Sequence, residues 1–291
     1  MSKILITGAT GLLGTTLAPY LKKCGYNIAT HARNGTADFL LDLADRDISF
    51  EMLTQIQPSM IINLASLTSV ELCQDEPNMA YLANTRIVEN IAYWIQKTEA
   101  NCHLIQISTD HIYDGALLHT EDKITLTNIY AFSKYAGELA AARVSSSILR
   151  TNFFGRSKAS HRVSLSDWVY DSMTNAIHVQ VLDDVYFSPL SMITLVEMIR
   201  LVIDKKPVGI FNLGSHNGMS KADFNFAFAK RLKLPTATMS RIETRQAGFL
   251  KAYRPKDMRM DCSKFENMFG VKLPKLSEEI IRVAKEYDEI T

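Results

Sequence analysis

The sequence lacks paired cysteines, long apolar runs and net charge. Its four cysteines, Cys24, Cys73, Cys102 and Cys262, are scattered and none forms a CxxC pair, so we expect reduced thiols and no zinc site. No stretch approaches the roughly 18 apolar residues of a membrane helix. With a formal net charge of +1, the chain offers no broad electrostatic attraction for nucleic acid or an anionic membrane. We therefore expect neither nucleic acid nor a membrane as a partner.

Targeting and linker segments are also missing from the pattern. The first residues, MSKILITGATG, have neither the length nor the cleavage site of a signal peptide. Together with reduced cysteines, this predicts a cytoplasmic protein. No strong acidic cluster predicts a metal site. The composition, 47% hydrophobic and 22% charged, is ordinary for a globular chain with a large core.

Short apolar runs alternate with helical patterns through the first half of the chain. The helices are expected at Leu12–Cys24, Met79–Lys97 and Tyr130–Arg143. The strands are expected at 3–7, 26–31, 39–43, 59–66, 103–108 and 146–150. Alternating strands and helices form βαβ units. The sequence therefore predicts an α/β fold, a Rossmann-like doubly wound parallel sheet covered on both faces.

A glycine-rich turn joins the first strand to the first helix. In TGATGLLG, Gly8 permits a tight turn and Gly11 lets backbone N–H groups approach a pyrophosphate. Gly14 allows close packing of the helix, whose N-terminus carries partial positive charge. This context predicts a dinucleotide site, the alternative being a turn that simply needs glycines. The predicted contacts are Gly8, Thr10, Gly11, Leu12, Leu13 and Gly14.

The residue after the second strand bears on the choice of cofactor. A carboxylate there would hold a ribose 2′-hydroxyl, but the segment reads THARNG and offers Arg33. An arginine can pair with a 2′-phosphate, so we expect NADPH rather than NADH, unless Arg33 is only a solvated surface charge. Asp42 and Leu43 are further predicted cofactor contacts, and Asp42 either accepts from the adenine amino group or caps a turn.

The boundary between two parts of the chain is expected near residue 155. Residues 1–155 would form the NAD(P)-binding Rossmann-like domain and residues 156–291 a smaller C-terminal substrate-binding lobe. Late strands near 179–184 and 209–215 are expected to rejoin the sheet. The lobe would form a cleft with the carboxyl edge of the sheet, where open α/β sheets bind ligands.

Tyr130 and Lys134, in YAFSK, are four residues apart and share one helix face. A free tyrosine has a pKa near ~10, which is a poor match to neutral pH. A nearby ammonium stabilises the phenolate and lowers that pKa. The pair can therefore exchange a proton and also hold a ribose.

The motifs together resemble the extended short-chain dehydrogenase/reductase superfamily. INLAS (62–66) is similar to its fourth-strand motif and Asn84 to its structural asparagine. Within the superfamily, four segments resemble the dTDP-4-dehydrorhamnose reductase family: 58–73, 107–115, 130–138 and 254–270. The resemblance covers essentially the whole chain. It implies a nicotinamide cofactor and a nucleotide-linked 4-keto-6-deoxy sugar as substrate.

The resemblance also implies the roles of individual residues. Thr109 would hydrogen-bond the C4 oxygen of the sugar, Tyr130 would be the general acid, and Lys134 would tune Tyr130 and bind the nicotinamide ribose. Further cofactor contacts are expected at Leu64, Ala65 and Ser66. Substrate contacts are expected at Thr68, Ser108, Asp110, His111, Asn152, Phe153 and Phe154.

Several of these expectations have open alternatives. Related 4,6-dehydratases carry a glutamate where this chain has His111, so dehydration is disfavoured. His111 either donates to a substrate oxygen or is a packed, hydrogen-bonded histidine. Phe153 and Phe154 either face the ligand or belong to the core. In YFSPLS (186–191), Leu190 replaces the threonine that is typical of the reductases, which leaves the identity of the sugar open.

Two other functions compete with the reductase. One is another reaction on a nucleotide sugar, such as epimerisation, in which the enzyme would retain its cofactor through purification. The other is a non-catalytic NADP-binding regulatory subunit, as in methionine adenosyltransferase, although a pure binder does not need Tyr130 as an acid. Helix pairs of this fold often build homodimers, and the sequence does not require one.

Overall fold

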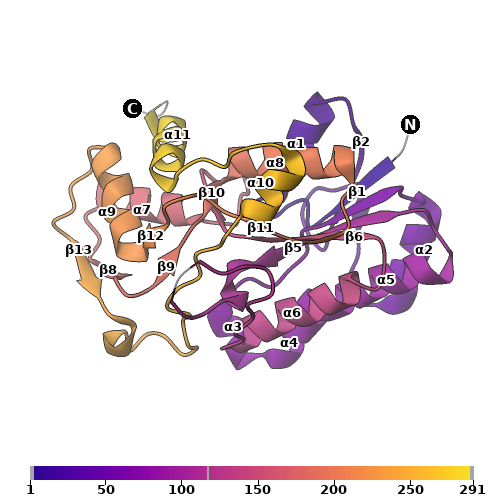
Figure 1. Cartoon of the computed structure of the whole chain (residues 1–291), viewed down its shortest axis with the longest axis horizontal. Helices are drawn as coiled ribbons and strands as arrows, with labels where there is room; N and C mark the ends of the chain where they lie inside the picture. The colour runs from indigo at the N-terminus through magenta and orange to yellow at the C-terminus, as the bar shows by residue number, and fades with distance from the viewer. Residues whose placement is uncertain (1–2, 117, 289–291) are drawn as a thin grey trace. The chain divides into compact units, whose positions relative to one another are not determined.

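The computed structural model describes residues 3–116 and 118–288 (Figure 1). The chain divides into two compact units. Unit 1 comprises Met1–Thr109, Asn128–Arg150 and Val196–Phe211, and unit 2 comprises Asp110–Thr127, Thr151–Leu195 and Asn212–Thr291. Among the described residues, no helix is both long and apolar enough to cross a membrane.

Unit 1 is built on a seven-stranded parallel sheet of order β11-β6-β5-β4-β1-β2-β3. The strands are β1 (Lys3–Thr7), β2 (Asn27–Ala32), β3 (Phe39–Leu40), β4 (Met60–Asn63), β5 (His103–Thr109), β6 (Ser146–Thr151) and β11 (Gly209–Leu213). β4 and β5 are buried along their whole length, as strands covered on both faces should be. The predicted α/β fold is confirmed.

Helices cover both faces of this sheet. In Figure 1, α1 (Gly14–Lys23) and α8 (Met192–Lys205) lie on one side, and α2 (Arg46–Ile56), α5 (Ile87–Lys97) and α6 (Ile129–Ala141) lie on the other. The remaining helices of unit 1 are α3 (Val70–Asp75), α4 (Pro77–Tyr81) and the π-helix η1 (Leu82–Arg86). The long helix expected over Met79–Lys97 is therefore interrupted by a π turn.

Helix α6 packs closely against η1. Gly137 lies so near the carbonyl oxygen of Asn84 that a Cβ at this position would be 2.3 Å from that oxygen. Real Cβ atoms do not approach oxygen so closely, because the atoms would overlap. Gly137 therefore sets the distance between α6 and the rest of the helical layer.

Unit 2 combines short two-stranded sheets with helices. The sheets pair β10 (Leu190–Ser191) with β7 (Phe153–Phe154), β12 (Met219–Ser220) with β9 (Tyr186–Phe187), and β13 (Met239–Ile242) with β8 (Val179–Leu182). The helices are the 3₁₀ turn η2 (Asp110–Ile112), α7 (Leu165–Thr174), α9 (Lys221–Arg231), the 3₁₀ turn η3 (Thr244–Gln246), α10 (Ser263–Phe269) and α11 (Leu276–Asp288).

One expectation about the late strands is wrong and one is confirmed. β11 joins the large sheet beside β6, but β8 pairs in parallel with β13. Val179 and Val181 of β8 are buried in the core of unit 2 with Phe224 and Phe228 of α9. β8 buries its apolar side chains against α9. Its apolar residues therefore belong to the core of unit 2 and not to the large sheet of unit 1.

A buried histidine at the start of β5 makes stability depend on pH. The ring nitrogens of His103 contact the hydroxyls of Ser145 and Ser147 at 2.9 and 2.8 Å. Burial lowers the pKa of His103 to about 4, and the charge of Lys206 adds to the effect. The folded state therefore prefers the neutral ring, while the unfolded chain takes up a proton near pH ~6.5.

We predict that the free energy of unfolding falls as the pH drops from about 6.5 toward 4. A single such histidine contributes a slope of up to ~1.4 kcal/mol per pH unit. His103→Gln should reduce the slope by that amount, measured by urea unfolding at a series of pH values. His161→Gln, at an exposed histidine, is the matched control and should leave the slope unchanged. A wild-type slope in His103→Gln would contradict the prediction.

Candidate active site

The carboxyl ends of three neighbouring strands bring the predicted site segments of unit 1 together. β1 pairs in parallel with β4, and β4 with β5. The glycine turn follows β1, residues 64–66 follow β4, and Ser108 and Thr109 end β5. Because the strands are parallel, these segments share one edge of the sheet, the usual ligand-binding edge.

The glycine turn has the geometry that its sequence predicts. Gly8 has a φ of +67°, and a Cβ there would lie 2.8 Å from the backbone nitrogen of Ala65. A Cβ on Gly14 would lie 2.6 Å from the Cα of Ala9. Gly8 is thus required by both conformation and space. Gly14 is required because α1 begins close to the turn.

The start of α1 is open to an anion. No side chain caps this helix terminus, and its first turn holds no acidic residue. The N–H groups of a helix start attract phosphate oxygens when no side chain occupies them. Together with the tight glycine turn, this arrangement fits the pyrophosphate of a dinucleotide.

The other predicted cofactor residues have varied surroundings. The Thr10 hydroxyl donates to the carbonyl oxygen of Asn34 at 3.1 Å. Arg33 is exposed, Leu12 is half-buried, and Leu13 and Leu43 are buried. Asp42 accepts from the Ala44 N–H at 2.9 Å, so one of its oxygens caps a turn, as one of the two alternatives expected.

A hydrogen-bonded asparagine organises the segment after β4. The Asn84 side chain accepts from the Ser66 hydroxyl and the Leu67 N–H, both at 2.8 Å, and its amide donates to Ser133 Oγ at 2.9 Å. Asn84 thus connects the loop after β4 to α6. Ser66 in turn accepts from Lys134 Nζ at 3.3 Å, which links this loop to the predicted catalytic lysine.

Lys134 carries a buried charge in the middle of unit 1. Its side chain is 4% exposed, and Nζ donates to the carbonyl oxygen of Ile107 at 2.8 Å. Burial lowers the pKa of Lys134 to about 8, whereas the nearby Glu138 and Cys73 raise it. A lysine whose pKa lies so near neutrality is typical of a functional site.

Tyr130, Thr109 and Ser108 are all buried at this edge of unit 1. Tyr130 packs against Cys73 and Ala80, on the helix face that also carries Lys134. Ser108 does not project a free hydroxyl toward a ligand, because it donates to Glu138 Oε1 at 2.5 Å. Thr68 is exposed in the loop before α3.

The predicted substrate residues of unit 2 form a polar cluster. Asn152 donates to the Asp110 carboxylate at 2.8 Å. Burial lowers the pKa of His111 to about 3, and the positive charges of Lys221 and Arg254 act in the same direction. His111 is therefore neutral at physiological pH and buried, which favours the packed histidine of the two alternatives. Burial lowers the pKa of Lys221, and the negative charge of Asp110 offsets part of this effect.

The two phenylalanines differ. Phe154 is fully buried, and its ring meets the rings of Phe224 and Phe228 edge-on at centroid distances of 4.8 and 6.5 Å. Its surroundings are therefore those of the core role, one of the two alternatives that the sequence left open. Phe153 is half-buried. The described residues contain no group of acidic, histidine or cysteine side chains that could hold a metal ion.

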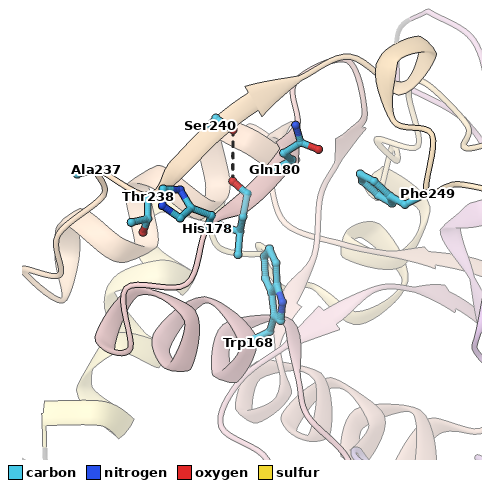
Figure 2. A pocket seen from close by; sticks show the side chains of 8 residues that line it. Trp168, His178, Gln180, Ala237, Thr238, Ser240 and Phe249 are labelled. Atoms are coloured by element: carbon cyan, nitrogen blue, oxygen red, sulfur yellow. Dashed lines mark hydrogen bonds between the residues drawn. The ribbon is translucent and has the colours of Figure 1, made fainter.

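A cavity of about 610 Å³ lies on the outer side of β8 and β13 in unit 2. Its lining includes two aromatic residues, Trp168 of α7 and Phe249, which are 36% and 57% exposed. Gln180 of β8 and Ser240 of the neighbouring strand β13 also line the cavity, and Figure 2 shows the rings of Trp168 and Phe249 apart from each other. Aromatic walls with a polar edge suit a flat ring that carries hydrogen-bonding groups.

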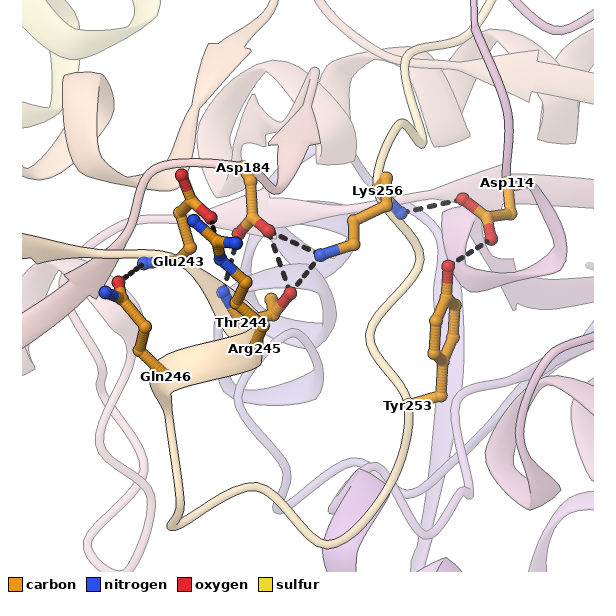
Figure 3. Close-up of polar contacts among 8 residues, drawn as sticks. All are labelled: Asp114, Asp184, Glu243, Thr244, Arg245, Gln246, Tyr253 and Lys256. Carbon is orange, nitrogen blue, oxygen red and sulfur yellow. Dashed lines mark hydrogen bonds and ion pairs between the residues drawn. The ribbon is translucent and has the colours of Figure 1, made fainter.

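The segment that carries Phe249 is attached to unit 2 at both ends (Figure 3). At the first end, Thr244 donates to the Asp184 carboxylate through N–H and hydroxyl, at 2.9 and 2.8 Å. At the second end, Lys256 pairs with Asp184, and its N–H donates to Asp114 at 2.7 Å. These contacts hold both ends of the segment that contains Phe249.

Sequence reasoning did not find several residues of these clusters. Glu138 lies four residues after Lys134 in a segment that was already noted, and this spacing was an available signal. Trp168 and Phe249 carried no local signal, since only the fold brings α7 and the later segment to one cavity. The same holds for Lys221, which the chain places far from Asp110.

Comparison with known proteins agrees with this geometry. The family described as "RmlD substrate binding domain" matches residues 2–289. The dTDP-4-dehydrorhamnose reductase of Escherichia coli (strain K12) is 26% identical over 309 residues, covering 97% of each chain. Methionine adenosyltransferase 2 subunit beta of Xenopus laevis is 25% identical, covering 94% of this chain and 84% of that protein.

A solved structure shows the same fold. The dTDP-4-dehydrorhamnose reductase of Bacillus anthracis in complex with NADP superposes with a TM-score of 0.88 at 24% identity, covering 98% of this chain and 100% of that chain. The fold, the glycine turn and the Tyr130–Lys134 helix thus agree with a family match over nearly the whole sequence. The chain belongs to the RmlD substrate-binding domain family, with the fold of the extended short-chain dehydrogenases/reductases.

Proposed function

We propose that this protein is an enzyme that uses NADPH to reduce the C4 keto group of a nucleotide-linked 4-keto-6-deoxy sugar. The observation that carries the proposal is the buried Lys134, on the same helix face as Tyr130 and bonded to β5 two residues before Thr109. The family includes reductases that act on such sugars. The uncapped start of α1 supports the cofactor assignment.

The residues of unit 1 have separate tasks in this reaction. The bound nicotinamide cofactor would supply a hydride to the C4 carbonyl carbon. Thr109 donates a hydrogen bond to the carbonyl oxygen and stabilises the negative charge that develops there. Tyr130 donates the proton that completes the alcohol. Lys134 keeps a positive charge beside Tyr130, which eases the loss of that proton.

Unit 2 would recognise the nucleotide, as the proposed substrate-binding lobe. Lys221 and Arg254 both place a positive charge near the buried His111. Asp110 places a negative charge near Lys221. With His111 neutral, these three charges leave an excess of positive charge, which suits a diphosphate. The cavity beside Trp168 suits the flat base of the nucleotide.

A binding-only role is the second candidate, because a methionine adenosyltransferase subunit is among the relatives. Binding of a dinucleotide requires the glycine turn and the start of α1. It does not require the combination of Thr109, Tyr130 and a buried lysine with a lowered pKa. We therefore favour the enzyme.

The first prediction tests the acid. With NADPH and dTDP-4-keto-6-deoxyglucose, the protein should oxidise NADPH, followed by absorbance, and Tyr130→Phe should lose about 10²–10⁴-fold in kcat, as expected for a missing proton donor. Tyr135→Phe is the matched control on the same helix, at a half-buried tyrosine, and should keep wild-type turnover. NADPH binding should survive in both. Turnover retained by Tyr130→Phe would contradict the assigned role.

The second prediction tests the cofactor preference. Arg33→Gln should weaken NADPH binding by ~10–100-fold and leave NADH binding unchanged, because a charged hydrogen bond to the 2′-phosphate contributes ~1.5–3 kcal/mol. Both affinities can be measured from cofactor fluorescence. Arg143→Gln, at another exposed arginine of unit 1, should change neither. Equal losses for both cofactors, or none, would refute the role of Arg33.

The third prediction tests the cavity of unit 2. Trp168→Ala should weaken the binding of dTDP by ~5–100-fold, as expected from the loss of one base–aromatic stack of ~1–3 kcal/mol. Calorimetry measures this without any turnover. Val163→Ala, at a residue that is 69% exposed, removes apolar surface outside the cavity lining and should have no effect. Unchanged dTDP affinity in Trp168→Ala would exclude the cavity as the base site.

A further inference from the structure

Glu138 shares a helix face with the two residues assigned to proton transfer. Tyr130, Lys134 and Glu138 follow one another at intervals of four residues on α6, which keeps them on one side of the helix. The Glu138 carboxylate accepts from Arg150 through Nε at 3.0 Å and Nη2 at 2.7 Å. It also accepts from Ser108. We call Ser108, Glu138 and Arg150 the Glu138 cluster.

We propose that Glu138 is a positioning residue of the reductase: through Ser108 it holds the end of β5 against α6, and through its charge it keeps Lys134 protonated. The inference rests on the proposed function, because it assigns a purpose to the same catalytic group. Neither the motif analysis nor the family match assigns this role to Glu138.

Two adjacent bonds fix the register of β5 against α6. Lys134 Nζ donates to the Ile107 carbonyl oxygen at 2.8 Å, and the Ser108 hydroxyl donates to Glu138 at 2.5 Å. Consecutive strand residues are thus tied to helix residues one turn apart. Thr109 is the next residue of the strand, so its position relative to the helix is set by these bonds.

The charges of this region depend on Glu138. Arg150, Glu138 and Lys134 are all buried, at 0%, 1% and 4% exposure. Burial lowers the pKa of Lys134 to about 8, and the charge of Glu138 is the largest influence that raises it. Cys73 on α3 also acts to raise the pKa of Lys134, and Tyr130 lies one turn before Lys134 on the same helix face. Burial raises the pKa of the Cys73 thiol to about 11, so this thiol carries no charge at neutral pH.

A purely structural Glu138 would predict different behaviour. A glutamine could accept the hydrogen bonds of Ser108 and Arg150, but it would supply no charge to Lys134. Removing one partner of a buried ion pair is destabilising, because the other charge stays uncompensated. The test therefore needs a variant that removes both charges of the pair and still deprives Lys134 of the carboxylate.

The experiment compares pH profiles of kcat/KM for wild type, Glu138→Gln and the double variant Glu138→Gln/Arg150→Met. In the variants Lys134 should lose its proton at lower pH, so the fall in activity at high pH should move down by at least one pH unit. A one-unit shift from a pKa of about 8 gives about a threefold loss at pH 7.5, about a tenfold loss at pH 9 and near wild-type activity at pH 6. Glu89→Gln, at the half-exposed carboxylate paired with Arg86, is the control and should keep the wild-type profile.

A second variant separates positioning from charge and from substrate contact. Ser108→Ala removes the bond to Glu138 and leaves every charge in place. A positioning role predicts about a tenfold lower kcat with an unchanged KM and an unshifted pH profile. A direct contact with substrate would instead raise KM. This variant decides the question if the Glu138 variants do not fold.

The outcomes overturn different claims. A wild-type pH profile in folded Glu138→Gln/Arg150→Met, or an unchanged kcat in Ser108→Ala, would overturn the role of Glu138. Absence of turnover in the wild type would overturn the proposed function. In that case the pH dependence of NADPH affinity, measured by fluorescence without any sugar, still tests Glu138. An equal pH dependence in wild type and the double variant would refute the influence on Lys134.

Discussion

The buried ammonium of Lys134 determines much of the arrangement of unit 1. A charge removed from water needs hydrogen bonds and an opposite charge nearby. Lys134 obtains them from β5, from the loop after β4 and from its own helix. All three must come close to one atom. Gly137 permits this approach of α6, and Asn84 fixes the loop that carries Ser66. The glycine in the helix and the asparagine in the π turn thus serve the same requirement.

The sequence predicted those features of the fold that depend on local pattern. Strands such as β1 and β4 contain continuous apolar runs because both faces of the sheet are covered, and such runs are visible in the sequence alone. The glycine turn was predictable because Gly8 and Gly14 have no room for a Cβ. The partner of β8 was not predictable. Alternating burial shows that a strand has one apolar face, and it does not show which helix covers that face.

The same distinction holds for the site. Tyr130 and Lys134 were found because their spacing alone puts them on one face. The surroundings of Ser108 and Phe154 depend on residues far away in sequence. The Ser108 hydroxyl donates to Glu138, and the ring of Phe224 on α9 packs against Phe154. A hydroxyl or a ring at the end of a strand looks the same whether a ligand or the protein itself is its partner. Only the folded neighbours decide between these alternatives.

The state of Lys134 also bears on the choice between an enzyme and a binding protein. A lysine that only holds a ribose would be most favourable at the surface, where its ammonium stays hydrated and its pKa stays near ~10.4. Burial destabilises the charged form of Lys134 and thereby lowers its pKa to about 8. The charge of Glu138 raises that pKa, and Glu138 is itself buried and paired with Arg150. The resulting charge is shielded by little water, so it acts more strongly on Tyr130, one turn away on the same helix face, than a surface ammonium would. The buried charge of Lys134 therefore supports the proposed enzyme over a protein that only binds its cofactor.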